Sequence, residues 1–156
     1  MWTATKVGGE HTGSVKINKG TLIVENSKLV GGNFTLDLTT IEDTDLTNAS
    51  MNEKLVGHLK SEDFFSVEKH PTSTFKITKS EIIPNAKKGS HNYIITGDIT
   101  KKDITHSITF PAAVSFNGNT AQATAKIEID RTKWDIKYRS GFLGTAADKL
   151  SMIILF

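Results

Sequence analysis

The stretch YIITGDITKKDITHSITFPAAVSF, residues 93–116, contains two apolar alternations separated by a short polar run. Mostly apolar or small residues occupy the odd positions from 93 to 99 and the even positions from 104 to 116, with KKD at 101–103 between them. A period of two is typical of half-buried antiparallel strands, and a tight polar turn joins such strands. This stretch predicts a β-hairpin.

The alternation continues after the hairpin. Asn117-Gly118-Asn119 follows at once, and Asn and Gly tolerate the positive φ that tight hairpin turns require. Apolar residues then take the odd positions from 121 to 129. We therefore expect a third strand here, paired with the second.

The N-terminal part shows the same period. Val30, Gly32, Phe34, Leu36 and Leu38 share one face of a further expected strand. Shorter strands are expected at 14–18 and 21–25, divided by a Lys-Gly turn, and a last one at 150–156.

The run RTKWDIKYR, residues 131–139, also alternates, with its apolar residues on even positions. The apolar phase therefore slips by one after Ile129. We expect a bulge or a short turn at Asp130-Arg131, followed by another strand that points its apolar side chains inward.

Only residues 50–60 have a helical pattern. Ser50 with Glu53 three residues later fits a capping box, and Met51, Leu55 and Leu59 recur at a spacing of four. We therefore expect one short helical insertion in a chain of strands.

Eight or nine short strands with one helix favour an all-β fold, a closed antiparallel barrel of about eight strands formed by a single domain, residues 1–156. A β-sandwich is the alternative. Several inward positions carry small residues, including Gly32, Gly97, Ala112 and Ala123. Small residues either leave room for an apolar ligand or reflect the taper of a barrel filled by its own side chains.

Composition excludes several classes of protein. The 156 residues are 37% apolar and 23% charged, which is typical of a globular domain, and no window is apolar enough for a membrane helix. A net charge of +2 is too small to indicate nucleic-acid binding. The chain has no cysteine, and its first twenty residues lack the apolar core of a secretory signal.

The five histidines are the candidates for catalysis or metal binding: His11, His58, His70, His91 and His106. None pair at a helical metal spacing and no nucleophile elbow is present, so we expect no metal, no cofactor and no catalytic residue. His106 alone lies on the apolar face of its strand. That position indicates either a hydrogen-bonded core histidine or a contact to a ligand headgroup.

The basic residues Arg131, Lys133, Lys137 and Arg139 alternate with Trp134 and Tyr138. In a strand the aromatic and charged side chains would lie on opposite faces, which argues against stacking on nucleic acid. Attraction of an anionic membrane or a diphosphate by these cations stays open.

The stretch HLKSEDFFSVEKHPTSTFKI, residues 58–77, predicts a helix-to-strand joint at one end of the barrel. Adjacent Phe64 and Phe65 cannot both point into the same core direction, so one is expected to cover the barrel opening. Pro71 disfavours a helical conformation at His70, which predicts an extended entry into the next strand.

The same region, KLVGHLKSEDFFSVEKHPTSTFKIT at residues 54–78, closely resembles the signature of the YceI-like family. Other stretches are similar to that family as well: KVGGEHTGSVKINKG at 6–20, LVGGNFTLDLTTIEDTDL at 29–46, GDITKKDITHSITFPAAV at 97–114 and DRTKWDIKYRSG at 130–141. The part after Tyr138 is shorter than the family pattern and lacks its usual acidic pair.

The resemblance implies a lipocalin-like barrel that binds or carries a polyisoprenoid or another long-chain, fatty-acid-like lipid without catalysis. It also implies a bacterial protein exported to the periplasm or secreted, although a cytoplasmic location stays open and so does a homodimer. The expected ligand contacts, chosen by parity and position, are Phe34, Leu36, Phe64, Phe65, Phe75, Ile77, Ile95, His106, Ile108, Phe110, Ile127, Ile129 and Trp134.

Two other functions compete with lipid binding. One is an enzyme that modifies a lipid or small molecule through His106. The other is a stress-response or structural interaction module that uses the barrel only as a scaffold.

Overall fold

The computed structural model describes residues 1–6, 9–117, 120–138 and 149–155. Its elements, in chain order, are β1 (Trp2–Lys6), β2 (Gly9–Glu25), β3 (Lys28–Asp43), α1 (Ala49–Lys60), β4 (Thr72–Ile82), β5 (Tyr93–Lys101), β6 (Ile104–Asn117), β7 (Thr120–Asp130), the 3₁₀ helix η1 (Arg131–Trp134) and β8 (Lys149–Leu155). The all-β class with one helical insertion after the third strand is confirmed.

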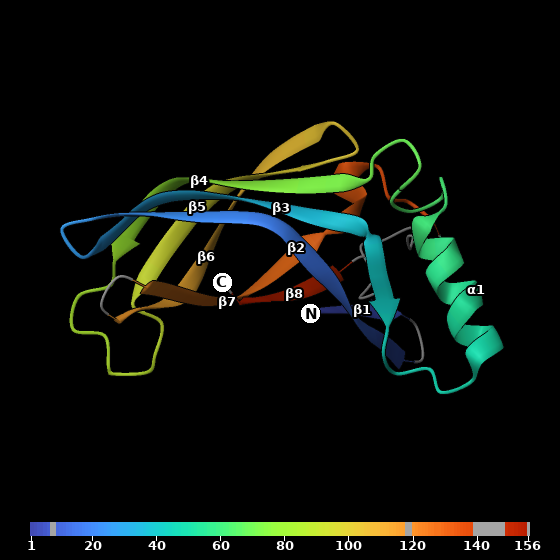
Figure 1. Cartoon of the computed structure of the whole chain (residues 1–156), viewed down its shortest axis with the longest axis horizontal. Helices are drawn as coiled ribbons and strands as arrows, with labels where there is room; N and C mark the ends of the chain where they lie inside the picture. Colours follow the sequence, from blue (N-terminus) through green and yellow to red (C-terminus); the bar gives the residue numbers. More distant parts are fainter. Residues whose placement is uncertain (7–8, 118–119, 139–148, 156) are drawn as a thin grey trace.

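Each strand pairs antiparallel with the next along the chain, and β1 also pairs with β8. The strands wrap around a common core, and α1 lies at one end of them (Figure 1). The sheet is continuous rather than split into the two packed layers of a sandwich. The short strand β1 was missed in the sequence because its WTATK pattern has few apolar residues.

The division of the N-terminal region into strands 14–18 and 21–25 was wrong. Strand β2 runs unbroken from Gly9 to Glu25, and its pairing with β3 shifts register after Ser14 and again after Ile17. Bulges absorb the extra residues without a turn, and they sharpen the coiling of a long strand. Lys19-Gly20 therefore lies within a strand.

The inward face of β3 follows the expected parity from Gly32 to Leu38 but not before it. Leu29 is buried and Val30 is 42% exposed, because the register with β2 shifts between Ile23 and Val24. The assignment of Val30 to the inner face was therefore wrong. Single-residue shifts of this kind move a side chain to the opposite face.

The opening hairpin is present as expected. Strands β5 and β6 are joined at Lys102 and Asp103, whose φ values of 47° and 60° place both in the left-handed region. Two such residues make a type I′ turn, which matches the twist of the flanking strands. The second expected turn joins β6 to β7, and its residues 118–119 lie outside the described part of the chain.

The helix begins earlier than its capping pattern indicated. Asn48, not Ser50, is the N-cap, and its side chain accepts a hydrogen bond from the Met51 backbone N–H at 3.0 Å. Leu59 is buried, whereas Met51 is 60% exposed. The apolar stripe of α1 therefore contacts the barrel mainly through its C-terminal half.

The strand expected at 131–139 is not present in its described residues. The Asp130 side chain accepts from the Thr132 backbone N–H at 2.9 Å and caps η1, and Asp135 then ends it with φ of 58°. The turn expected at Asp130-Arg131 is therefore present, but a 3₁₀ helix follows it. Trp134 and Ile136 are still buried.

Aromatic rings fill the middle of the barrel. Phe75 stacks on Phe34 with ring centroids 6.4 Å apart and packs against Phe110 at 5.7 Å. A Cβ added to Gly97 would lie 2.5 Å from the Phe75 ring, and one added to Gly32 would meet Ile77 at 3.3 Å. At Gly97 the small residue accommodates a large neighbouring ring, which favours the tapering-barrel interpretation, whereas at Gly32 the closest atom is the Thr21 carbonyl oxygen at 2.6 Å.

Across the described residues, no helix combines the length and the apolar character needed to span a membrane.

Candidate functional site

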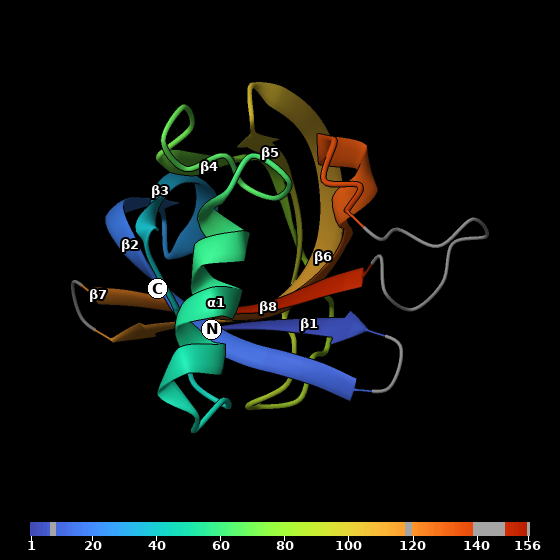
Figure 2. The same ribbon diagram turned by 90° about the vertical axis from the view of Figure 1, so that its right-hand side faces the viewer.

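One end of the barrel is covered by structure that is not part of the sheet. Helix α1 crosses in front of this end, beside the loop 61–71 and η1 (Figure 2). We call this region the helix end. Strands β3 and β5 both finish here, at Asp43 and Lys101, because they run in the same direction on either side of β4.

Lys101 is the unusual residue of the helix end. It continues the inward alternation of β5 after Tyr93, Ile95, Gly97 and Ile99, and it is only 4% exposed. A lysine is almost never buried to this extent without an anionic partner. Among the described residues, no ion pair or hydrogen bond to its ammonium group accompanies this burial.

Two aromatic rings enclose this ammonium group. Lys101 Nζ lies 5.6 Å from the ring centroid of Phe65 in the loop and 5.9 Å from that of Trp134 in η1. Cation–π contacts of this kind partly replace the lost hydration of the charge. Burial away from water lowers the pKa of Lys101 to about 8, so the group still carries its charge at neutral pH.

A second aromatic cluster lies outside this enclosure. The His58 ring packs edge-on against Tyr138 at 4.2 Å and against Phe64 at 5.1 Å. The Arg131 guanidinium lies 5.3 Å from the Phe64 ring centroid and donates to the carbonyl oxygens of Ile136 and Tyr138. This cluster holds the chain after η1 against the loop.

Polar contacts tie η1 to the strands below it. His106 Nε2 lies 2.9 Å from the Lys133 carbonyl oxygen, and its ring packs edge-on against Trp134. Trp134 Nε1–H donates to the Ile99 carbonyl oxygen at 3.2 Å. The sequence predicted two alternative roles for His106, and a hydrogen bond to a neighbouring residue is one of them. Its ring contacts Trp134, which is also one of the two rings around Lys101.

The residues expected to contact a ligand mostly point into the barrel. Buried ones are Phe34, Leu36, Phe65, Phe75, Ile77, Ile95, Phe110, Ile127, Ile129 and Trp134. Phe64, His106 and Ile108 are partly buried. Phe65 faces the Lys101 enclosure, whereas Phe64 lies in the outer cluster. Leu36 is buried outside the main core cluster.

Sequence reasoning missed Lys101 because it assigned the whole KKD run to a turn. The alternation of β5 extends to position 101 without a break, so the same parity rule would have placed this lysine on the inner face. Tyr93 and Ile99 were placed on that face by the same alternation and are buried there, although neither was among the expected ligand contacts.

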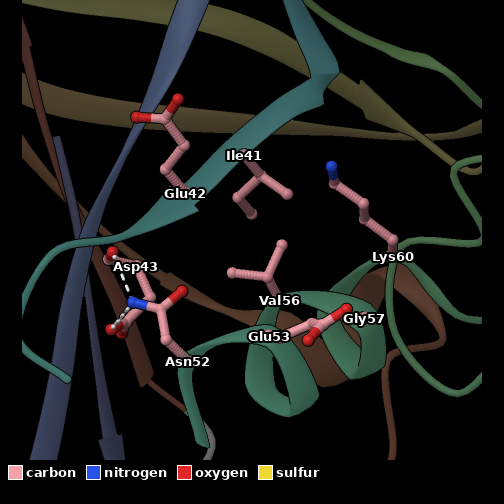
Figure 3. A pocket seen from close by; sticks show the side chains of 8 residues that line it. All are labelled: Ile41, Glu42, Asp43, Asn52, Glu53, Val56, Gly57 and Lys60. Atoms are coloured by element: carbon pink, nitrogen blue, oxygen red, sulfur yellow. Dashed lines mark hydrogen bonds between the residues drawn. The ribbon is translucent and has the colours of Figure 1, made fainter. Parts of the chain in front are cut away.

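A groove of about 480 Å³ lies between the end of β3 and α1 (Figure 3). Ile41 and Val56 contribute apolar side chains to it, whereas Glu42, Glu53 and Lys60 bring charge. Asn52 reaches across from the helix and donates to both the carbonyl oxygen and Oδ1 of Asp43, at 3.0 and 3.2 Å. The groove therefore lies between β3 and α1, and the Asn52–Asp43 hydrogen bonds connect these two elements across it.

Three other histidines, His11, His58 and His70, make polar contacts near the same end, whereas His91 is exposed in the loop between β4 and β5. His58 Nε2 lies 3.4 Å from Asp63, and His70 Nδ1 lies 3.3 Å from Asp103. His11 lies beside Asp43 and Asp45, a convergence that no spacing in the sequence indicated. Only the pairing of β2 with β3 brings these three side chains together.

The sequence matches the model of the YceI-like domain family over residues 2–155. Curated relatives include a UPF0312 protein of Pseudomonas paraeruginosa, 33% identical over 104 residues that cover 67% of this chain and 43% of that protein. Protein YceI of Escherichia coli O157:H7 is 29% identical over 128 residues, covering 78% of this chain and 59% of its own. The chain spans about half the length of the curated relatives that it matches.

Solved structures share the fold. BcnA of Burkholderia cenocepacia superimposes with a TM-score of 0.67 at 18% identity, covering 99% of this chain and 92% of that one. A YceI protein of Campylobacter jejuni gives 0.65 at 16% identity, covering 92% and 82%. These likenesses support a lipocalin-like barrel.

Proposed function

The chain belongs to the YceI-like family, and from that premise we propose that it binds and carries a long-chain amphiphile, such as a polyisoprenoid. The apolar tail lies in the lumen of a closed eight-stranded barrel, and an anionic head lies against Lys101 at the helix end. The observation that carries the proposal is the burial of Lys101 without an anionic partner among the described residues.

The head of the ligand supplies what Lys101 lacks. A charged lysine in a water-poor enclosure gains far more from an anion than a surface lysine does, because the interaction is little screened. Phosphate and carboxylate heads both offer such an anion. The enclosure thus favours anionic amphiphiles over neutral ones.

The tail supplies most of the affinity. Burial of each methylene contributes about 0.8 kcal/mol, so a tail of ordinary length binds strongly without polar contacts. The inward aromatic rings of Phe34, Phe75 and Phe110 already pack together. Entry of a tail therefore requires these rings to change rotamer, and the proposal includes an opening step in which Phe65 and Trp134 move apart.

Binding is tested with a pair of ligands that differ only in the head, a polyprenyl phosphate and the corresponding polyprenol. Lys101→Met is expected to weaken phosphate binding at least tenfold and to leave polyprenol binding unchanged, as follows from a lost charge-assisted contact. Lys126→Met is the matched control, because Lys126 lies on an outward face and is largely exposed. Equal affinity of wild type and Lys101→Met for the phosphate would overturn the headgroup assignment.

The lumen is tested separately. Ile108 lies opposite Gly97 in the β5–β6 pair and packs against the core cluster. Ile108→Trp is expected to block uptake of both ligands while the protein still folds. Native mass spectrometry of the purified protein measures uptake and also shows whether one or two copies carry the ligand. Unchanged loading of a folded Ile108→Trp variant would contradict a tail in the lumen.

We propose no catalytic role for His106. Its Nε2 is engaged with the Lys133 carbonyl oxygen, and the ring next to it is Trp134, so it positions η1. A His106→Ala variant that binds polyprenyl phosphate but loses a turnover activity of the wild type would favour the enzyme alternative. A partner protein retained by unliganded protein would favour the interaction module.

We propose a periplasmic or secreted location, which rests on the family resemblance. Cell fractionation of the native protein tests it, and recovery with cytoplasmic markers would contradict it.

A further inference from the structure

Three ligand-type side chains meet beside the helix end, apart from the Lys101 enclosure. His11 comes from β2, Asp43 ends β3, and Asp45 follows it. One nitrogen or oxygen atom from each lies within 4.8 Å of the other two. His11 Nδ1 is 3.0 Å from Asp45 Oδ2 and 4.0 Å from Asp43 Oδ2.

Each carboxylate is oriented through its other oxygen. Asp43 Oδ1 accepts from the Leu46 backbone N–H at 2.9 Å and from Asn52 Nδ2 at 3.2 Å. Asp45 Oδ1 accepts from the Thr12 backbone N–H at 2.7 Å. The two Oδ2 atoms therefore face His11 from fixed directions. Bonds to carboxylate ligands from surrounding donors orient metal sites in this way.

The Oδ2 atom of Asp43 points to a ligand. The Asp43 side chain is fully buried, and within the described part of the chain Oδ2 has no hydrogen-bond partner. A buried carboxylate oxygen without a donor is costly and rare in folded proteins.

The chemistry of the three groups is that of a divalent transition-metal site. Zinc binds imidazole nitrogen and carboxylate oxygen at about 2.0–2.2 Å, so its ligand atoms lie roughly 3.3 Å apart in a tetrahedron. His11 Nδ1 lies 3.0 Å from Asp45 Oδ2 and 4.0 Å from Asp43 Oδ2, one distance slightly below that spacing and one above it. Small side-chain rotations would bring Asp43 to the same distance as Asp45. Asp45 and His11 keep some exposure to solvent, which gives an ion a path and leaves a coordination position for water.

We propose that His11, Asp43 and Asp45 bind one divalent transition-metal ion of the zinc class. The ion joins the start of β2 to the end of β3, and through Asn52 it also fixes the orientation of α1. The site is thus a clamp on the helix that covers the barrel end. It does not depend on the lipid-binding function.

The test uses the whole 156-residue chain without a tag, treated with a chelator, dialysed and titrated with zinc chloride alone. Calorimetry is expected to give one ion per chain with a dissociation constant in the micromolar range or below, and thermal denaturation is expected to shift to higher temperature with zinc. Asp43→Asn and His11→Ala are each expected to weaken binding at least tenfold. His11→Ala is the safer variant for folding because His11 is not fully buried.

Two matched controls test the assignment. His91→Ala removes an exposed loop histidine, and Glu42→Gln removes the exposed acid next to Asp43 in β3. Both variants are expected to bind zinc as the wild type does. Absence of one-to-one binding, unchanged binding by folded His11→Ala, or an equal loss in His91→Ala would overturn the proposal.

Discussion

Lys101 and Asp43 are two buried charges at the same end of the barrel, and the fold surrounds them in opposite ways. Lys101 lies between two aromatic rings, and desolvation is the only influence that its surroundings exert on its pKa. Asp43 receives two hydrogen bonds on one oxygen and faces His11 with the other. The cation is held by packing and the anion by directed polar contacts, so changes in packing and in polar contacts affect them differently.

Trp134→Ala is expected to have the largest effect, because it removes a wall of the Lys101 enclosure. Trp134 is 1% exposed and donates to the Ile99 carbonyl oxygen, so truncation should cost about 3–5 kcal/mol in the free energy of unfolding. Urea denaturation measures the loss. Zinc binding by the Asp43 site should be unchanged in the folded variant.

A matched control for this truncation is Phe116→Ala. Phe116 is a 36% exposed aromatic residue near the end of β6, at the β6–β7 connection. Its loss should cost about 1 kcal/mol or less. Similar losses in the two variants would mean that the enclosure is no more tightly packed than the surface.

Lys101→Met tests the energetic cost of the buried cation. The folded pKa of Lys101 is lowered from 10.5 to about 8 by desolvation, which corresponds to roughly 3 kcal/mol at neutral pH. Below about pH 8 the lysine is charged in both states and the full cost is present. Between pH 8 and 10.5 the unfolded state binds the extra proton, so wild-type stability rises with pH.

The variant is therefore expected to be more stable than the wild type at pH 7 by roughly 3 kcal/mol, and the difference should shrink toward zero by about pH 10.5. Parallel urea denaturation of both proteins from pH 7 to 10.5 measures this difference, in which other titrating groups cancel. A constant difference across that range would show that Lys101 is not desolvated.

The two charges also differ in how far the sequence predicts them. Lys101 follows from a local rule, because the alternation of β5 continues through Ile99 to position 101 and the type I′ turn begins only at Lys102. Asp43 follows from no local rule. It meets His11 because Gly13 lies opposite Asp43 in the β2–β3 register, which shifts at bulges further along. Such shifts depend on tertiary packing.

The same distinction explains the error at η1. Thr132, Trp134 and Ile136 alternate as in a strand, and the inward direction of Trp134 was predicted correctly. The side chain of Asp130 and the left-handed backbone of Asp135 instead form a capped 3₁₀ turn. Local side-chain hydrogen bonds can override a short period-two pattern because they satisfy the backbone without a neighbouring strand.

Asn52→Ala removes hydrogen bonds that hold Asp43, and it is expected to lower the free energy of unfolding by about 1–2 kcal/mol. Its amide donates to Asp43 and to the Leu46 carbonyl oxygen, and loss of buried hydrogen bonds has costs of this size. Chemical denaturation measures the loss, and Glu53→Ala on the same helix should change stability by less than about 0.5 kcal/mol. An equal change in both would mean that Asn52 does not anchor Asp43.

Gly57→Ala is expected to have the smallest effect and the opposite sign. Gly57 lies in α1, lines the groove beside Asp43, and has nothing within 4 Å of an added Cβ. Alanine favours the helix over glycine by up to about 1 kcal/mol, so the variant should be more stable by a similar or smaller amount. Zinc affinity should stay the same, since the added methyl touches neither Asp43 nor Asn52.

Gly97→Ala gives the contrast that makes this result informative. There the added Cβ would lie 2.5 Å from the Phe75 ring, so the same substitution should destabilise the protein. Thermal denaturation of both variants distinguishes an open helix surface from a filled barrel. If Gly57→Ala also destabilised the protein, the surface of α1 at Gly57 would have to be packed against a neighbour instead of open.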